Sequence, residues 1–265
     1  MSIAQKKSLG QHFLRAQSVL NTMCTTAEIK PGDTVVEIGP GTGTLTTTLL
    51  NTGATVIALE KDHRLIPVLT QHFAIALAEK KLILKEKDVL EFNPLDISTT
   101  SYKIVANIPY YITGAILEKF LSAKKQPVTM TLLVQKEVAR RIVARDGKES
   151  LLSISVKAYG EPQYIKTVSR NLFSPPPKVD SAILHIKNIS KKNFSDETKE
   201  KKFFQLVKAG FGHKRKMLKN NIATLIQEYG LTSEEFFTDT NINISSRAED
   251  VPLSQWIILA EKKFN

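Results

Sequence analysis

The segment Val35–Gly43 constrains the fold of this chain more than any other. An apolar run with strand character, Val35–Ile38, leads directly into the turn Gly39-Pro40-Gly41-Thr42-Gly43, and a helical pattern follows. Glycine allows the backbone to turn tightly and to approach a bound ligand closely. The segment therefore predicts an α/β protein with a ligand site at this turn. Its glycine spacing differs from the Gly-x-Gly-x-x-Gly pattern of dinucleotide enzymes.

Strand-like and helix-like segments alternate from about residue 30 to residue 187. Such alternation predicts a parallel sheet with helices on both faces. The last two strands have no long helix between them, so we expect a hairpin at the edge of the sheet. The expected strands are Thr34–Ile38, Thr55–Glu60, Leu82–Lys85, Lys103–Asn107, Thr129–Val134, Tyr164–Val168 and Ala182–Ile186. The expected helices are Leu45–Asn51, His63–Leu77, Ala115–Ala123 and Lys136–Ala144.

The pattern changes after Ile186. Residues 187–216 hold ten Lys or Arg and three acidic residues, a net charge of +7, and apolar residues from Phe203 to Phe211 recur at helical spacing. The tail to Asn265 has no strand pattern. We therefore expect two domains, an α/β domain at residues 1–188 and a small all-helical domain at residues 189–265.

The whole chain is strongly basic, with a formal net charge of +11 and a sequence pI of about 9.6. Lys and Arg release condensed counterions from phosphates, so this balance favours a nucleic-acid partner. The single cysteine, Cys24, excludes an internal disulfide, and no Cys/His cluster has zinc spacing. No apolar run has the length of a signal peptide or a membrane span. These features predict a cytoplasmic protein without membrane association.

Two acidic positions follow the glycine turn at the ends of strands. Glu60 ends the second strand, and an acid about 20 residues after such a turn can accept hydrogen bonds from both hydroxyls of a ribose. Asp88-Val89 follows the third strand. Asp88 fits two roles equally well, as an acceptor for an adenine amine of the ligand or as the cap of a turn.

The segment Asn107-Ile108-Pro109-Tyr110, at the end of the fourth strand, points to a specific reaction. An aromatic amine is hard to methylate because its lone pair is delocalised into the ring. Two acceptors, the side-chain oxygen of Asn107 and the main-chain carbonyl of Ile108, can draw the amine toward tetrahedral geometry. Pro109 fixes the backbone so that both converge, and Tyr110 offers a face for stacking. The segment predicts methylation of the exocyclic amine of adenine.

With these motifs, the chain resembles the RNA adenine dimethyltransferase family, in its ribosomal small-subunit branch. The glycine turn looks like the first motif of Rossmann-like class I methyltransferases, which binds the amino-acid end of S-adenosylmethionine. The resemblance continues in order along nearly the whole chain. The further matching segments are Ser8–Leu14, which looks like the motif that closes over the cofactor, the loop Phe173–Ala182, the basic segment Phe211–Asn221, which looks like a helix of the C-terminal domain, Arg247–Glu249 and Leu259-Ala260.

The resemblance implies a Rossmann-like methyltransferase sheet, S-adenosylmethionine as cofactor with S-adenosylhomocysteine as product, and no metal. The implied substrate is small-subunit (16S) ribosomal RNA in an assembling subunit, dimethylated at two adjacent adenines of its 3′-terminal hairpin by a monomer. Tyr110 and Phe173 are expected to sandwich the target base. The expected cofactor residues are His12, Leu14, Gly39, Gly41, Gly43, Glu60, Asp88, Val89 and Asn107. The expected RNA contacts are Lys178, Lys214, Arg215, Lys216 and Lys219.

The chain departs from the family's usual pattern at two places. Many members carry Asn where this chain has His12. The usual Tyr-Gly pair after the fourth helix is replaced by Glu149-Ser150. A carboxylate at this position would repel RNA.

Three other functions are compatible with parts of the sequence. The first is a dimethylase of large-subunit ribosomal RNA, against which the loop Pro175–Ala182 and the basic C-terminal segment argue. The second is a ribosome-assembly factor that binds without catalysis, against which the intact segment Asn107–Tyr110 argues. The third is a nicotinamide oxidoreductase, which the glycine spacing disfavours.

Overall fold

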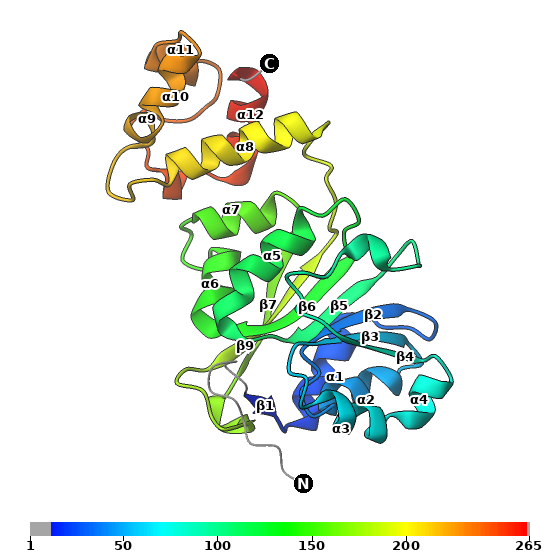
Figure 1. Cartoon of the computed structure of the whole chain (residues 1–265). Helices are drawn as coiled ribbons and strands as arrows, with labels where there is room; N and C mark the ends of the chain where they lie inside the picture. The colour runs from blue at the N-terminus through cyan, green and yellow to red at the C-terminus, as the bar shows by residue number, and fades with distance from the viewer. Residues whose placement is uncertain (1–11, 264–265) are drawn as a thin grey trace. The chain divides into compact units, whose positions relative to one another are not determined.

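The computed structural model describes residues 12–263, which divide into two compact units (Figure 1). The sheet unit runs to Ala139 and resumes at Glu161–Ile189. The helical unit comprises Arg140–Gly160 and the chain from Ser190 onward. Each unit is built around a hydrophobic core of its own.

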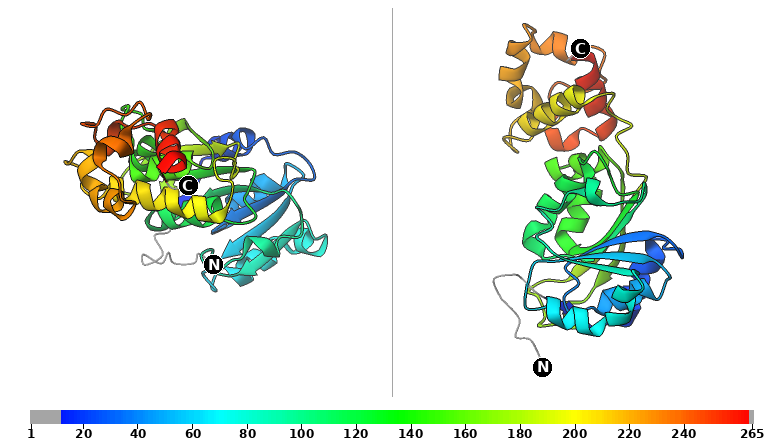
Figure 2. Two further views of the ribbon diagram at one scale, coloured as in Figure 1. Left: turned by 90° about the horizontal axis from the view of Figure 1, so that it is seen from above. Right: turned by 45° about the vertical axis from the view of Figure 1, so that its right-hand side comes forward.

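A seven-stranded sheet forms the centre of the sheet unit, in the order β4-β3-β2-β5-β6-β9-β7. The right-hand view of Figure 2 shows the twist of this sheet. Neighbours from β4 to β6 are parallel, and within the described sheet β9 alone runs antiparallel, between β6 and β7. The strands are β2 (Thr34–Ile38), β3 (Thr55–Glu60), β4 (Leu82–Glu86), β5 (Lys103–Asn107), β6 (Thr129–Gln135), β7 (Glu161–Val168) and β9 (Ser181–Lys187). All seven expected strands and the expected hairpin are confirmed.

Helices bury both faces of this sheet, as the apolar character of its strands requires. On one face, Val35, Val56 and Val105 share a core with Leu20 of α1 and Leu49 of α2. The alternate residues of the same strands are also buried, which shows that the other face is covered as well. The helices of this unit are α1 (Gln17–Thr26), α2 (Thr44–Leu50), α3 (Ile66–His72), α4 (Ala74–Ala78), α5 (Thr113–Leu121) and the first half of α6 (Lys136–Val143).

A second sheet of two short strands joins distant parts of the chain. Strand β1 (Phe13–Leu14) pairs antiparallel with β8 (Phe173–Ser174), and Leu14 lies opposite Phe173. Neither strand was expected, since two-residue strands leave no periodic pattern in a sequence. The pairing fixes the segment that begins at His12 against the loop before β9.

Trp256, fully buried, lies at the centre of the helical unit. It shares a core with Phe203 and Leu206 of α8 and with Ile154 of α7. The helices are α7 (Leu151–Lys157), α8 (Glu197–Gly210), α9 (Leu218–Asn221), α10 (Ala223–Glu228), α11 (Ser233–Phe237) and α12 (Leu253–Lys263).

Residues 140–160 pack with this helical core, although the sequence analysis placed them in the first domain. The reason is that α7 was not expected. Its Ser150 caps the first turn by accepting from the Ser153 N–H (3.1 Å), and its apolar side chains Ile154 and Ala158 face the C-terminal helices. The sequence of a short amphipathic helix does not show which of two cores its apolar side chains join. Only the structure assigns α7 to the helical unit.

Gly210, the last residue of α8, tests the packing of the helical unit. A Cβ placed there would stand 2.4 Å from the Trp256 ring and 2.8 Å from Leu218, both fully buried. Overpacking of this kind costs about 1–3 kcal/mol, which exceeds the ~1 kcal/mol that alanine gains over glycine within a helix. We expect Gly210→Ala to lower the free energy of unfolding.

Gly114 of α5 provides the matched control, since no described atom lies within 4 Å of its Cβ position. Gly114→Ala is expected to raise the stability by up to about 1 kcal/mol. Denaturant melts of both variants check the pair. A Gly210→Ala protein as stable as Gly114→Ala would contradict the packing around Trp256.

Candidate active site

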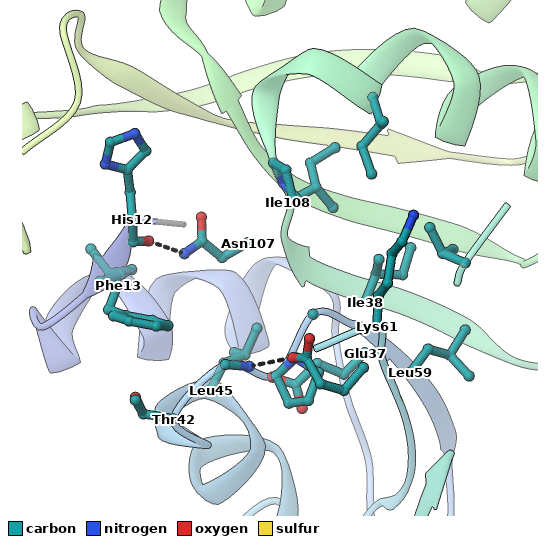
Figure 3. A pocket seen from close by; sticks show the side chains of 18 of the residues that line it. His12, Phe13, Glu37, Ile38, Thr42, Leu45, Leu59, Lys61, Asn107 and Ile108 are labelled. Atoms are coloured by element: carbon teal, nitrogen blue, oxygen red, sulfur yellow. Dashed lines mark hydrogen bonds between the residues drawn. The ribbon is translucent and has the colours of Figure 1, made fainter. Parts of the chain in front are cut away.

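A cavity of about 210 Å³ opens at the carboxyl ends of β2, β3 and β5 (Figure 3). The chain leaves β2 toward β3 and β4 and then returns to β5 on the other side of β2. Ligands of open α/β sheets bind where the strand order reverses in this way. The residues around the cavity come from five segments, together with Leu20. These segments are His12–Leu14, Glu37–Leu45 without Gly43, Leu59–Lys61, Lys87–Leu90 and Asn107–Ile112.

The glycine turn forms the floor of this cavity. Gly39, Gly41 and Gly43 all have positive φ angles, of 68°, 59° and 86°. A Cβ at Gly41 would stand 2.8 Å from the Phe13 ring, whereas no described atom lies within 4 Å of that position at Gly39. Gly39 and Gly41 line the cavity. Gly43, the residue before α2, does not line it, and its Cβ position lies against the Phe73 ring.

Glu60 lies at the end of β3 with its side chain buried beside the glycine turn. One carboxylate oxygen accepts from the Gly41 N–H (3.2 Å) and the other from the Asp62 N–H (2.8 Å). Burial raises the pKa of Glu60, while these two hydrogen bonds oppose the rise. Each oxygen keeps a further lone pair, so the carboxylate can still accept from two hydroxyls.

Glu37, at the other side of the turn, is a site residue that the sequence analysis used only as part of the motif. It is 1% exposed and accepts a hydrogen bond from the Thr46 hydroxyl (2.7 Å). Burial, reinforced by the charge of Glu60 and opposed by the Thr46 bond, raises the pKa of Glu37 to about 8. A single acid within an otherwise apolar strand is the feature of the sequence that could have identified it.

Asp88 is held by an ion pair that was not expected. Its Oδ2 accepts from Lys61 Nζ (2.6 Å) and its Oδ1 from the Leu90 N–H (2.9 Å). Burial would raise the pKa of Asp88, but these hydrogen bonds outweigh it and lower the pKa. Val89, beside it, is buried and lines the cavity. Both roles considered for Asp88 are compatible with this position, since it caps a turn and also borders the cavity.

Asn107 ends β5, and its amide group is oriented by one hydrogen bond. Its Nδ2 donates to the main-chain carbonyl of His12 (3.1 Å), 95 residues away in the sequence. Figure 3 shows this bond, with the Asn107 Oδ1 turned away from it. Ile108, next in the chain, is buried and lines the same wall. The side-chain oxygen of Asn107 is therefore not engaged by the His12 carbonyl.

Tyr110 borders the same part of the cavity. Its hydroxyl forms a 2.5 Å hydrogen bond with the Ser181 hydroxyl, and Ser181 is fully buried. Burial raises the pKa of Tyr110, while the bond to Ser181 opposes the rise. The His12 ring lies 6.0 Å from the Tyr110 ring, centroid to centroid, with 23° between their planes. The Tyr110 ring is therefore fixed at one end and faces another ring.

Phe173 occupies a different environment from the one expected for it. It is 4% exposed, lies opposite Leu14 in the β1–β8 pair and belongs to the core of the sheet unit. It is not among the described residues that line the cavity. The apolar neighbours available in the β1–β8 pair explain why this ring is buried rather than turned toward a base.

Three of the basic residues proposed as RNA contacts lie in a loop, and not on a helix as expected. Helix α8 ends at Gly210, and α9 begins only at Leu218. The Asn221 side-chain amide closes the loop by donating to the carbonyls of Gly210 (2.6 Å) and His213 (3.1 Å). Lys214, Arg215 and Lys216 are exposed in this loop, while Lys219 lies on α9. Lys178 is exposed in the loop between β8 and β9.

The sequence analysis expected Glu149 to present a free carboxylate, but the structure pairs this side chain with a lysine. Its Oε1 accepts from Lys157 Nζ (2.6 Å), and its side chain is 12% exposed. Lys157 ends the helix that Ser150 caps, so the pair replacing Tyr-Gly stabilises α7. Neutralisation by Lys157 removes the expected repulsion of RNA.

Some expectations fall at or beyond the limits of the described chain. Ser8–Gln11, part of the N-terminal motif, lie outside the described residues. Among residues 12–263, no group of three or more His, Cys, Asp and Glu side chains is arranged to hold a metal ion. None of the helices described is both long and apolar enough to cross a membrane.

The raised pKa of Glu37 has a measurable consequence for stability. The folded protein holds this proton up to a pH of about 8, against an ordinary value of 4.5 for the carboxyl group. Its contribution to stability therefore falls as the pH rises from about 5 to about 8. Glu37→Gln keeps an acceptor for Thr46 but cannot ionise. We expect the Tm of the variant minus that of the wild type to increase across this window, measured by calorimetry. A difference independent of pH would contradict the assignment.

A family model described as Ribosomal RNA adenine dimethylase matches residues 3–263 of this chain. Among curated relatives, a protein named Ribosomal RNA small subunit methyltransferase A from Dehalococcoides mccartyi is 42% identical over 260 residues, covering 96% of this chain and 87% of the relative. Proteins of the same name from Crocosphaera subtropica and Fusobacterium nucleatum are 39% and 35% identical, and each alignment covers at least 96% of both chains.

Two solved structures are similar over nearly their full length. The 23S rRNA methyltransferase ErmE has a TM-score of 0.76 and 26% identity, covering 96% of this chain and 100% of ErmE. A dimethyladenosine transferase from Plasmodium falciparum has the same TM-score and identity, covering 94% of this chain and 96% of its own. Since the family model and the relatives span almost all residues, the chain belongs to the ribosomal RNA adenine dimethylase family of methyltransferases.

Proposed function

We propose that this chain dimethylates N6 of two adjacent adenines in the 3′-terminal hairpin of small-subunit (16S) ribosomal RNA, with S-adenosylmethionine as methyl donor. The observation that carries the proposal is the orientation of Asn107. Its Nδ2 is bound to the His12 carbonyl, so its Oδ1 is the atom left to accept from a substrate amine. The names of the relatives, all small-subunit methyltransferases at 35–42% identity, support the choice of RNA.

The chemistry of the cavity fits S-adenosylmethionine. The cofactor carries positive charge, and the cavity walls include the buried acids Glu37 and Glu60. Glu60 would accept from the ribose hydroxyls, Asp88 with Val89 would border the adenine, and the turn at Gly39 and Gly41 would receive the amino-acid end. When bound, the cofactor supplies a methyl group on a sulfonium, which leaves behind a neutral thioether. Leu14, buried at the edge of the cavity, would cover it.

The residues of the chain act on the amine by positioning it. The Oδ1 of Asn107 accepts one N–H, and the main-chain carbonyl of Ile108 accepts the other. Both bonds favour a tetrahedral nitrogen whose lone pair points into the cavity, and both strengthen as positive charge develops on the nitrogen. The ring of Tyr110 supports the base by stacking. No residue is assigned as a dedicated base, and the amine proton passes to water.

The target adenine must leave its stack before its amine can reach the cavity. Exposed basic side chains would hold the surrounding RNA through its phosphates. Those in the loop after α8 belong to the most basic stretch of the chain, and Lys178 belongs to the loop before β9. The proposed partner is the small ribosomal subunit during assembly, consistent with the net charge of +11.

Asn107→Ala tests the catalytic assignment. We expect the single-turnover rate of methyl transfer to fall by about 100-fold or more, as happens when one transition-state hydrogen bond is removed. The affinity for S-adenosylmethionine, measured by calorimetry, should stay nearly unchanged. Asn107→Asp retains acceptor oxygens but loses the N–H group that donates to the His12 carbonyl. Its rate should therefore lie between that of the wild type and that of Asn107→Ala. A near-normal rate in Asn107→Ala with normal cofactor affinity would exclude this role.

Neutralising the proposed phosphate-binding residues tests the RNA assignment. Each cation that no longer pairs with a phosphate should reduce the slope of log affinity against log salt by about 0.7–0.9. Binding to small ribosomal subunits should weaken and become less salt-dependent, while the cofactor affinity stays the same. The variant replaces Lys214, Arg215, Lys216 and Lys219 with Gln. A control with the same charge change replaces the exposed residues Lys30, Lys80, Lys81 and Lys166. Equal salt slopes for the two variants would mean that the loop only solubilises the protein.

A further inference from the structure

A short turn follows β3 and contacts the acid that ends this strand. Asp62 comes two residues after Glu60, and its main-chain N–H donates to one oxygen of the Glu60 carboxylate (2.8 Å). Glu60 lines the cavity, but Asp62 and Arg64 do not. The turn therefore reaches Glu60 from outside the cavity.

Arg64 holds the Asp62 carboxylate at both of its oxygens. The Nε of Arg64 donates to Oδ1 (2.9 Å), and its Nη2 donates to Oδ2 (2.6 Å). The main-chain N–H of Arg64 also donates to Oδ1 (3.2 Å). Two-pronged pairing of this kind is the strong form of an arginine–carboxylate contact. The Arg64 side chain is 34% exposed, so its guanidinium reaches from the surface to a buried acid.

Three buried acids lie close together at this point of the sheet unit. Glu37, Glu60 and Asp62 are 1%, 5% and 3% exposed. Burial raises the pKa of Glu37 and the pKa of Glu60. The charge of Glu60 adds to the first rise, and the charge of Asp62 adds to the second. Neighbouring carboxylates that have no counter-charge do not all stay ionised, so the guanidinium at Asp62 affects the whole group.

Other charged or titratable side chains near Glu60 are exposed or already paired. Lys61 forms an ion pair with Asp88 (2.6 Å). His63, in the turn, is exposed, and so is Glu86, which lies opposite Glu60 in the register of β3 and β4. The positive charge that pairs with the acid next to Glu60 therefore comes from the arginine of the turn.

We propose that Arg64 is a positioning residue of the cofactor site, which neutralises Asp62 and so keeps Glu60 ionised and in place. The inference rests on the proposed function, because it assumes that Glu60 accepts hydrogen bonds from the ribose of the cofactor. Without the guanidinium, the two neighbouring acids would take up a proton at a higher pH. A protonated carboxyl group loses part of its capacity to accept from the ribose hydroxyls.

The affinity for a cofactor product, measured against pH, tests this role without any catalytic step. The probe is S-adenosylhomocysteine, titrated by calorimetry into the full chain from about pH 5 to about pH 8. Arg64→Gln removes the charge, Arg64→Lys keeps it, and Asp62→Asn removes the acid. A double variant combines Asp62→Asn with Arg64→Gln. Arg140→Gln, at an exposed arginine of the helical unit, is the control.

Each dissociation constant is divided by that of the wild type at the same pH, so that titration of groups common to both proteins, such as Glu37, cancels. For Arg64→Gln we expect this ratio to fall from about 10 at the acid end to near 1 at the alkaline end, since a pKa raised by about one unit changes the ionised fraction tenfold. For Arg64→Lys the ratio should not depend on pH.

The acid variants should show the opposite effect or none. Asp62→Asn removes the negative charge beside Glu60, so it should bind the probe more tightly than the wild type at the acid end. The double variant replaces the ion pair with a neutral pair and should give a ratio near 1 at every pH. The control Arg140→Gln should do the same.

A ratio for Arg64→Gln that is raised equally at every pH would overturn the proposal, because a merely structural role does not depend on ionisation. A ratio of 1 throughout would overturn it as well. If melting shows that Arg64→Gln does not fold, Asp62→Asn decides, and binding no tighter than the wild type at the acid end would contradict the role of Arg64. If the wild type does not bind the probe, the proposed function fails too. If it binds and the Arg64→Gln ratio is flat, only the role of Arg64 fails.

Discussion

The hydrogen bond from Asn107 Nδ2 to the His12 carbonyl is the interaction on which the site depends. It joins the end of β5 to the segment that starts β1, and β1 in turn pairs with β8. This one bond engages the Nδ2 of Asn107 and leaves its Oδ1 free of it. It also holds the segment His12–Leu14, which lines the cavity, against the end of β5. Because both partners are partly shielded from water, leaving either unpaired would cost about 1–3 kcal/mol. The bond thus links the stability of the fold to the orientation of the Asn107 amide.

The second constraint is the pair of acids beside the glycine turn. Glu37 and Glu60 are both buried, and the charge of Glu60 contributes to the raised pKa of Glu37. Burying two neighbouring carboxyl groups without a cation is costly. The N–H of Gly41 in the turn and the hydroxyl of Thr46 in α2 offset part of this cost. A cationic cofactor would supply the complementary charge.

Much of the fold could be predicted because the pattern that encodes it is local. The seven strands of the large sheet show apolar runs of the right length, and the turn after β2 carries its own glycines. Helices α1 and α7 were missed. Each of them buries its apolar side chains in a core that distant segments of the chain form. The basic segment after α8 was expected to be helical, but Asn221 caps the carbonyls of Gly210 and His213 and holds it as a loop.

The sequence by itself determined the residues whose chemistry depends on their covalent neighbours, namely the glycine turn, Glu60 at a strand end, and the segment from Asn107 to Tyr110. Only the tertiary structure decided which atoms of these residues remain available. His12 reaches Asn107 across 95 positions and the Pro175 carbonyl across 163. Phe173 is buried because Leu14 lies opposite it. Hydrogen bonds and packing between such distant segments arise only when the whole chain has folded, so no local pattern can encode them.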